Sequence, residues 1–309
     1  MVDFGWKERL EALLEQPVEW GRSLDQYTSL GIGGPADAVA TVEKKNELGP
    51  LLRFLAEEKL PWRVLGRGTN VLARDEGFAG VILLLGTEYQ TVGEPAEISE
   101  SGAVLLQGGG GCSLVRLSRS CIEQGLSGLE FCCGIPGTLG GAVVMNAGAW
   151  GGDMASVVRR VILATVDGEK TMAGEELDFC YRRWRGFEQY QGQAVVTEVE
   201  FELQRGDREE IRKRCRTLQE RRKAAQQVPY ANAGSFFKNP PNDSAGRLIE
   251  ACGLKGTSIG GAMVSEQHGN FLVNRGKATA SDMLSLMKVV QYRVKNESGI
   301  ELEPEVHFI

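Results

Sequence analysis

The sequence predicts an α+β protein built from three units, and three observations support this. Its 309 residues correspond to about two domains at ~150 residues each, with room for a third. Amphipathic helical patterns and short apolar strand patterns are mixed along the chain, and the middle is richer in strands. Glycine is unusually frequent, with 40 residues, or about 13 per cent against an average of about 7 per cent.

The first unit is expected over residues 1–85. It begins with an acidic amphipathic segment, Met1–Gln16, which carries Trp6, Leu10, Leu13 and Leu14 on one helical face. A glycine turn at 30–35 precedes a strand, and leucines at helical spacing then predict a helix over Glu47–Glu58. The expected strands are Ala38–Val42, Trp62–Leu65, Val71–Ala73 and Val81–Leu85.

The second unit, residues 86–205, has more strands. A strand over Ala103–Gln107 leads into four glycines and a helix over Ser113–Gln124, followed by a stretch of small and apolar residues at 135–152. Val157–Val166 and Ala194–Leu203 alternate as strands do, and we place them around a hairpin turn at Asp167-Gly168.

The third unit is expected over residues 206–299, and the tail, 300–309, is expected to return to the first unit near the functional site. Asp207–Gln227 predicts a charged boundary helix, which is either a solvated helix or one whose arginines reach a diphosphate. A helix over Ala245–Cys252 and a strand over Asn270–Asn274 follow. The last helix, Ser281–Asn296, has a capping signal in Thr279 and Asp282 and ends at Gly299.

Charge and composition exclude several function classes. Acidic residues outnumber basic ones by 41 to 35, which argues against a nucleic-acid partner or binding to an anionic membrane surface. No apolar run approaches the ~18 residues of a membrane span, and the first residues lack a signal-peptide pattern. We therefore expect a cytoplasmic protein with no membrane partner; its oligomeric state is not indicated.

The seven cysteines do not suggest a metal site. They show no C-x-x-C spacing, and His268 and His307 are the only histidines. Cys132 and Cys133 are adjacent and could form a redox pair. We favour instead two small reduced residues packed beside the glycine loop that follows them.

The glycine patches fit turns with positive φ or loops whose backbone approaches a phosphate. A Rossmann fingerprint is absent, because Gly66-x-Gly68-x-Asn70 lacks a third glycine and runs into a strand pattern. No P-loop motif is present either. By themselves these loops are compatible with a nucleotide site or with plain turns.

Longer motifs carry a closer resemblance. The run from Leu65 to Leu72 resembles the pyrophosphate loop of the FAD-binding fold of the vanillyl-alcohol-oxidase type, and the run from Gly128 to Ala149 resembles its second flavin loop. With the segment from Thr28 to Ala36 and the run from Gly234 to Pro240, the chain resembles the UDP-N-acetylenolpyruvoylglucosamine reductase (MurB) family, in its shorter type II form. The similarity extends from about Asp25 to Ile309.

The resemblance implies a two-subdomain FAD-binding fold followed by a C-terminal α+β substrate domain. It implies non-covalent FAD, with NADPH as reductant. The implied cofactor-binding residues lie in the two flavin loops: Gly66, Arg67, Gly68, Thr69, Asn70, Val71, Leu72, Gly134, Ile135, Pro136, Gly137, Gly140, Gly141, Asn146, Ala147, Gly148 and Ala149.

The resemblance also implies the reaction. NADPH reduces the flavin and leaves, the enolpyruvyl sugar nucleotide takes its place, and a hydride goes to the vinyl carbon, which leaves negative charge beside the carboxylate. By matching motifs, Ser235 is the proton donor, Arg182 stabilises the enolate and Glu305 completes the site. The expected substrate contacts are Tyr181, Lys238 and Asn239.

The three catalytic candidates each have a structural alternative. Ser235 could be a turn residue, Arg182 a surface charge and Glu305 a solvated residue of the tail. His268 is expected to be a structural hydrogen-bonding residue. The chain departs from the family pattern at Trp184, where a serine is usual. Two other functions remain open, namely an oxidase of another small substrate on the same fold, or a non-catalytic flavin- or nucleotide-binding protein.

Overall fold

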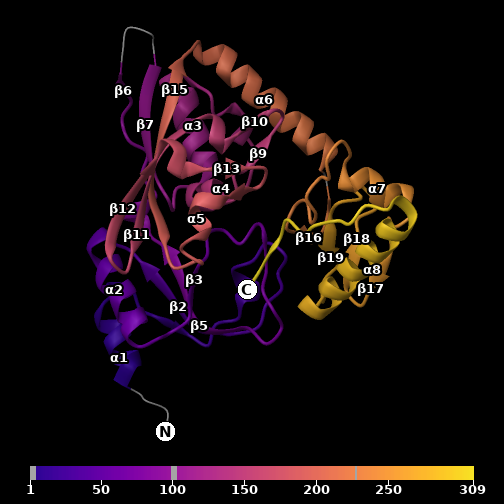
Figure 1. Cartoon of the computed structure of the whole chain (residues 1–309), viewed down its shortest axis with the longest axis horizontal. Helices are drawn as coiled ribbons and strands as arrows, with labels where there is room; N and C mark the ends of the chain where they lie inside the picture. Colours follow the sequence, from indigo (N-terminus) through magenta and orange to yellow (C-terminus); the bar gives the residue numbers. More distant parts are fainter. Residues whose placement is uncertain (1–4, 99–102, 227) are drawn as a thin grey trace. The chain divides into compact units, whose positions relative to one another are not determined.

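The computed structural model describes residues 5–98, 103–226 and 228–309 (Figure 1). Two predicted helices extend beyond these ranges. Residues 1–4 of the expected N-terminal helix and Gln227, the last residue of the expected charged helix, lie outside the described residues. The chain divides into two compact units. Unit 1 consists of Met1–Trp20, Ala38–Gly66 and Gly80–Arg221, and unit 2 of Gly21–Asp37, Arg67–Ala79 and Arg222–Ile309.

A four-stranded sheet lies within residues 1–85, in the order β1-β2-β5-β3. Its strands are β1 (Glu19–Trp20), β2 (Ala36–Val42), β5 (Phe78–Leu85) and β3 (Trp62–Val64). Helices α1 (Gly5–Ala12) and α2 (Lys45–Glu57) contribute to the core on this sheet. The leucines that predicted α2 are buried, so this helix and the β2, β3 and β5 predictions are confirmed within a few residues.

A six-stranded sheet lies within residues 86–205. Its strands are β12 (Gly168–Ala173), β11 (Val158–Thr165), β15 (Val195–Arg205), β7 (Ala103–Gly109) and β6 (Ala96–Glu97), with β8 (Leu126–Ser127) also paired to β15. Helices α3 (Leu114–Gln124) and α4 (Leu139–Val144) lie over it and share its hydrophobic core (Figure 1).

The predicted hairpin at Asp167-Gly168 is only half right. The turn is present, but it joins β11 to β12, with Thr165 opposite Gly168, and not to Ala194–Leu203. That later segment forms β15, which pairs with the other edge of β11. The sequence pattern hides β12 because it is a largely exposed edge strand in which only Met172 is buried.

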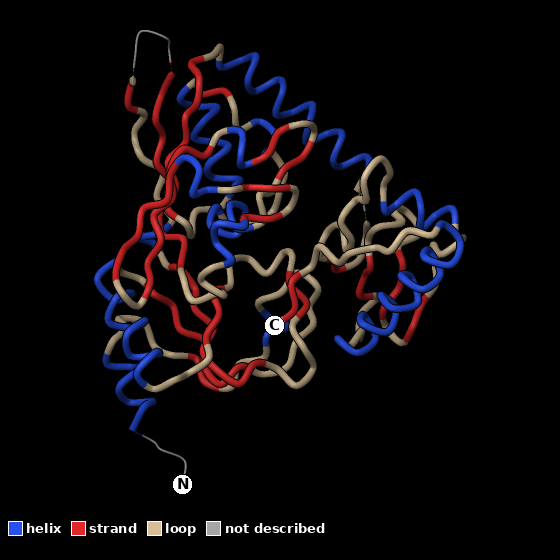
Figure 2. Tube along the Cα trace, in the orientation of Figure 1, coloured by secondary structure: helices blue, strands red, loops and turns tan. Residues whose placement is uncertain are grey.

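A third sheet, in the order β16-β19-β18-β17, lies within residues 206–299. Its strands are β16 (Ala231–Asn232), β19 (Leu272–Asn274), β18 (Ala262–Val264) and β17 (Ser258–Ile259). Helices α7 (Ala245–Ala251) and α8 (Ala280–Ser298) pack beside these strands (Figure 2). The predicted capping box of α8 is confirmed, since Thr279 and Asp282 bond reciprocally and Gly299 ends the helix with a φ of 74°.

The C-terminal segment pairs with the first flavin loop, the pyrophosphate-type loop at residues 66–72. Strand β20 (His307–Phe308) pairs in parallel with β4 (Val71–Leu72), both in unit 2. The three larger sheets thus fall within 1–85, 86–205 and 206–299, while β20 joins the tail to the loop at 71–72. The division into three domains at those boundaries stays a prediction.

The remaining α-helices and strands are short, apart from α6, which follows β15 in the sequence. They are β9 (Gly148–Ala149), β10 (Gly152–Asp153), β13 (Phe179–Cys180), β14 (Arg183–Trp184), α5 (Arg185–Glu188) and α6 (Arg208–Ala225). In α6, Arg212 pairs with Glu209 and Arg216 with Glu220, as expected for a solvated charged helix. No helix in the described part of the chain combines the length and apolar character of a membrane span.

A disulfide corrects one cysteine prediction. Cys133, which directly precedes Gly134 of the second flavin loop, is bonded to Cys215 of α6, so the expectation that Cys133 is reduced is wrong. Both residues belong to unit 1 and are buried beside Ile211. The neighbouring Cys132 keeps its thiol. The signal was missed because the partner lies 82 residues away in sequence, on an otherwise polar helix.

We expect reduction of the Cys133–Cys215 bond to lower the free energy of unfolding by about 2–4 kcal/mol, because it releases a long closed loop in the unfolded chain. Urea unfolding with and without a phosphine reductant measures this difference. The Cys133→Ser/Cys215→Ser variant should unfold like the reduced protein and be insensitive to reductant. Five thiols titrated in the untreated, denatured protein would agree with the bond; seven would contradict it.

Asp75, which follows the first flavin loop, connects this part of the chain to helix α8 through hydrogen bonds. Its carboxylate accepts hydrogen bonds from the backbone N–H groups of Ala280 (2.6 Å) and Ser281 (2.9 Å) and from the Ser281 hydroxyl (2.7 Å). These donors lie in the first turn of α8, where the helix dipole also favours an anion. Burial opposes ionisation of the carboxyl, but the bonds from Ser281 and Ala280 outweigh it and lower the pKa of Asp75.

Replacing Asp75 by alanine should therefore lower the free energy of unfolding by about 1–2 kcal/mol at neutral pH. Since the folded-state pKa lies below the unfolded value, this contribution is complete above the unfolded pKa and fades as the pH falls through the folded pKa. Urea unfolding at a series of pH values measures the difference. Glu76→Ala, at the exposed next position, should have little effect; equal losses in both variants would refute the assignment.

Candidate active site

The first flavin loop needs glycine at two positions. In unit 1, a Cβ on Gly66 would overlap the Thr138 hydroxyl, so this loop approaches the second flavin loop through a bare backbone. In unit 2, Gly68 has a φ of 60°, and a Cβ there would collide with the carbonyl oxygen of Tyr27. The Gly68 carbonyl accepts a hydrogen bond from the backbone N–H of Ser29 (3.0 Å).

The second flavin loop lies in unit 1 and winds into α4. Gly134 and Gly137 have φ values of 89° and 141°, and Thr138 caps the helix through its hydroxyl. The backbone N–H of Gly140 donates to the carbonyl of Gly110 (2.7 Å), which fixes the helix start against the end of β7. The sequence therefore forms a tight turn, a one-residue cap and a short helix of small residues.

The second loop has the surface that a flattened aromatic cofactor needs. Ile135 and Pro136 are apolar yet partly or fully exposed, and Gly137 and Thr138 are also accessible. A loop of glycine and small apolar residues lets a ligand approach the backbone closely. These residues fit FAD by shape and chemistry.

Asn146 is the best buried polar residue of this loop, at 2 % exposure. Its Nδ2 group donates to the carbonyl of Cys180 (2.9 Å) and its Oδ1 accepts from the N–H of Ala155 (2.9 Å). It adopts a φ of 40°, which asparagine tolerates better than most residues. The side chain thus links the flavin loop to the hairpin β13–β14, so contact with a cofactor would come from its backbone.

Tyr181 and Arg182 form the two-residue turn of that hairpin. Arg182 has a φ of 56°, and its guanidinium donates to the carbonyl of Gly148 (2.7 Å). The guanidinium carbon lies 4.9 Å from the centre of the Tyr181 ring. Within unit 1 the structure therefore joins Arg182 to the end of the second flavin loop, while its catalytic role stays a prediction.

Trp184 shows how the hairpin accommodates the departure from the family pattern. The indole is 1 % exposed and stacks on Phe187 at 5.3 Å between ring centres, with Phe179 at 5.4 Å. Its Nε1 group has no hydrogen-bond acceptor among the described residues. The side chain points into the core and away from the turn, so the backbone at Arg182 keeps a tight two-residue turn.

Unit 2 contains the other two predicted catalytic residues, Ser235 and Glu305, on segments that are hydrogen-bonded to each other. The backbone N–H of Glu305 donates to the carbonyl of Phe236 (2.9 Å), the residue after Ser235. Ser235 follows Gly234, whose φ is 73°, and both Ser235 and Glu305 are partly exposed. Asn70 of the first flavin loop donates through Nδ2 to the Glu305 carbonyl (3.0 Å), so this loop also reaches the pair.

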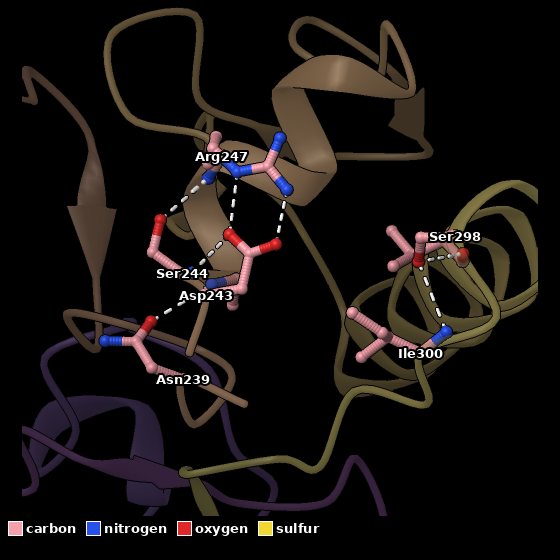
Figure 3. Close-up of polar contacts among 8 residues, drawn as sticks. Asn239, Asp243, Ser244, Arg247, Ser298 and Ile300 are labelled. Carbon is pink, nitrogen blue, oxygen red and sulfur yellow. Dashed lines mark hydrogen bonds and ion pairs between the residues drawn. The ribbon is translucent and has the colours of Figure 1, made fainter. Parts of the chain in front are cut away.

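Two predicted substrate contacts are engaged by the protein. The Lys238 ammonium lies 2.5 Å from a carboxylate oxygen of Glu303, which is 69 % exposed and can give way. The Asn239 amide oxygen accepts from the N–H of Ala245 at the start of α7 (Figure 3). Its amide nitrogen is a donor of the kind that phosphate oxygens accept.

Comparison with known proteins agrees with this arrangement. Residues 36–172 match the family described as FAD binding domain, and residues 226–309 match UDP-N-acetylenolpyruvoylglucosamine reductase, C-terminal domain. The UDP-N-acetylenolpyruvoylglucosamine reductase 2 of Symbiobacterium thermophilum is 45 % identical over 97 % of this chain and 95 % of that protein. The chain belongs to the UDP-N-acetylenolpyruvoylglucosamine reductase family.

Other members of this family extend the similarity along the whole chain. The reductase of Syntrophus aciditrophicus is 42 % identical over 99 % of this chain and 96 % of its own. The crystal structure of MurB from Thermus caldophilus superposes with a TM-score of 0.77 and 38 % identity, covering 94 % of this chain and 98 % of that one. The expected FAD-binding fold with a MurB C-terminal domain is confirmed, as is an FAD- and NADPH-dependent oxidoreductase of peptidoglycan precursor synthesis.

His268 has the structural role expected of it. Its Nδ1 accepts the backbone N–H of Asn270 (3.2 Å), and its ring lies 4.3 Å from that of Phe271. Burial, together with the charge of Lys255, lowers the pKa of His268, so a neutral acceptor nitrogen is available at neutral pH. The strand expected over Asn270–Asn274 begins only at Leu272, and no local pattern in the sequence marks the role of Asn270.

We expect Gly66→Ala to lower the free energy of unfolding by about 1–3 kcal/mol, because the new methyl group overlaps the Thr138 hydroxyl and forces the two loops apart. It should also release FAD, which fluorescence of the cofactor in the filtrate measures. Gly49→Ala is the matched control, since its methyl group meets only Arg53 at 3.6 Å within a helix. Retention of FAD by Gly66→Ala would refute the close approach.

Proposed function

We propose that this protein uses NADPH to reduce the enolpyruvyl group of UDP-N-acetylenolpyruvoylglucosamine, giving UDP-N-acetylmuramate, in the cytoplasm. The observation that supports the proposal is the backbone hydrogen bond from the N–H of Glu305 to the carbonyl of Phe236, which pairs the segment that carries Glu305 with the segment where the family motif has its proton donor, Ser235. An oxidase of another substrate would have no evident use for this pairing.

FAD would be held non-covalently by the backbone of the two flavin loops, 66–72 and 134–149. When bound and reduced it supplies the hydride. The protein contributes a loop surface of small residues that lets the ring system approach.

Arg182 would bind the substrate carboxylate. Addition of a hydride to the vinyl carbon leaves negative charge on the neighbouring carbon and its carboxylate, and a guanidinium stabilises such a planar, delocalised anion through two parallel hydrogen bonds. The bond from Arg182 to the Gly148 carbonyl and the contact with Tyr181 hold this side chain in place before substrate arrives. Preorganisation of this kind reduces the cost of ordering the arginine in the transition state.

Ser235 would then donate its hydroxyl proton to the negatively charged carbon beside the carboxylate. A serine is a weak acid, but the proton acceptor here is a strongly basic carbanion, so reach and orientation decide the rate. Glu305 would assist from the C-terminal segment, close to Ser235 through Phe236. Lys238, Asn239 and Tyr181 would contact the sugar nucleotide, whose diphosphate matches an ammonium and an amide donor.

We expect Ser235→Ala to retain reduction of its flavin by NADPH but to lose about 10²–10⁴-fold in the rate at which the sugar nucleotide reoxidises it, because general acid catalysis contributes that much. The two half-reactions are followed separately under anaerobic conditions by bleaching and recovery of the visible flavin band.

Ser298→Ala is the matched serine control. Ser298 donates to the carbonyl of Val294 and accepts from Ile300 at the end of α8 (Figure 3), so its loss should leave both half-reactions unchanged. A Ser235→Ala variant with a normal second half-reaction would remove the proton-donor role. Bleaching without recovery in the wild-type protein would move the function to another substrate.

A further inference from the structure

Asn270 is 3 % exposed and holds both residues that follow Ser235. Its backbone carbonyl accepts the N–H of Phe236 (2.8 Å). Its side-chain oxygen accepts the N–H of Phe237 (2.9 Å), and its side-chain nitrogen donates to the carbonyl of Phe237 (2.8 Å). One asparagine therefore forms three hydrogen bonds to the backbone of two consecutive residues.

The opposite side of the same segment holds the C-terminal residues. The carbonyl of Phe236 accepts from the N–H of Glu305, Phe237 forms a bridge with Pro304, and the N–H of Lys238 donates to the carbonyl of Glu303 (2.9 Å). The segment 236–238 thus lies between Asn270 and the residues around Glu305. A shift of this segment away from Asn270 would therefore displace Ser235, the residue that directly precedes it.

Asn270 is itself firmly placed. His268 accepts its backbone N–H through Nδ1. On the preceding residue, Gly269, a Cβ would lie 2.5 Å from the carbonyl oxygen of Gly246, so the chain here packs closely against α7. Phe236 and Phe237 are fully buried, and their rings lie 5.5 Å apart. The asparagine is therefore a fixed point against which the Ser235 loop is set.

We propose that Asn270 is a positioning residue that sets the place of the Ser235 hydroxyl for proton donation; this inference rests on the proposed function. The position requires a short side chain with one donor and one acceptor, because it pairs with both the N–H and the C=O of Phe237. Alanine would leave these two buried groups unpaired, and the segment would move to find new partners. Proton donation fails with small displacements, since a misplacement of about 1 Å can cost about 10²-fold in rate.

The test compares Asn270→Ala with the wild-type protein in both half-reactions. We expect flavin reduction by NADPH to stay within about 2-fold, and reoxidation by UDP-N-acetylenolpyruvoylglucosamine to fall by about 10–10²-fold. Flavin content and urea unfolding are measured on the same samples. Asn270→Asp puts a second oxygen opposite the carbonyl of Phe237 in place of the donor nitrogen, so it should lose at least as much in reoxidation as Asn270→Ala.

Asn274→Ala is the matched control. Asn274 also lies in unit 2, and its side chain makes four hydrogen bonds, to the carbonyl of Leu30 and from the N–H groups of Gly276, Lys277 and Ala278, all outside residues 234–238. Its loss should lower stability without a selective effect on reoxidation. An equal effect of the two asparagine variants on the two half-reactions would reduce Asn270 to a structural residue.

The decisive measurement is the double variant Ser235→Ala/Asn270→Ala. If Asn270 acts through the Ser235 hydroxyl, its replacement has no further effect on reoxidation once that hydroxyl is gone. If the loss in the double variant equals the product of the losses in the two single variants, the inference is overturned while the proposed function stays intact. Absence of reoxidation in the wild-type protein would overturn the proposed function and this inference with it. If Asn270→Ala does not fold, Asn270→Ser takes its place in the same cycle, with the same two outcomes.

Discussion

The site depends on one constraint: buried backbone groups in loops must find hydrogen-bond partners that no helix or sheet supplies. Loops rich in glycine bring their backbone into the interior, where an unpaired N–H or C=O is costly. Two buried asparagines meet this need, Asn146 in unit 1 and Asn270 in unit 2. Each joins a loop that carries a proposed catalytic residue to a neighbouring segment, so in the proposed mechanism the bonds that stabilise the loops also position the reacting groups.

Charge has a smaller part in this arrangement than geometry. Arg182 and Asn70 both hold the site through bonds to backbone carbonyls, of Gly148 and Glu305 respectively. Two ion pairs of the basic helix α6, Arg212–Glu209 and Arg216–Glu220, lie on exposed side chains, where such pairs contribute little. A site assembled from backbone contacts tolerates changes of many side chains, provided that the glycines and asparagines keep their conformations.

Features with strong local signals could be predicted from the sequence. Helix α8 was foreseen with its cap and its final glycine because Thr279, Asp282 and Gly299 act on their immediate neighbours. Ser235 and Arg182 were assigned from longer motifs. Strand β12 and the Cys133–Cys215 bond were not foreseen, because an exposed edge strand has a weak pattern and a disulfide partner carries no local mark. Asn270 was missed for a similar reason: its bonds go to residues 33 positions away.

The pairing of β20 with β4 bears on the order in which the chain folds. Asn70 and Glu305 are joined across 235 residues, and the carbonyl of Ile309 accepts the N–H of Arg74. During synthesis the first flavin loop therefore leaves the ribosome long before the C-terminal residues 305–309, with which it pairs in the folded protein. Contacts of such long range form late, because closing a large loop costs entropy that only the finished contacts repay. Competence to hold the cofactor should thus be among the last properties that the nascent protein acquires.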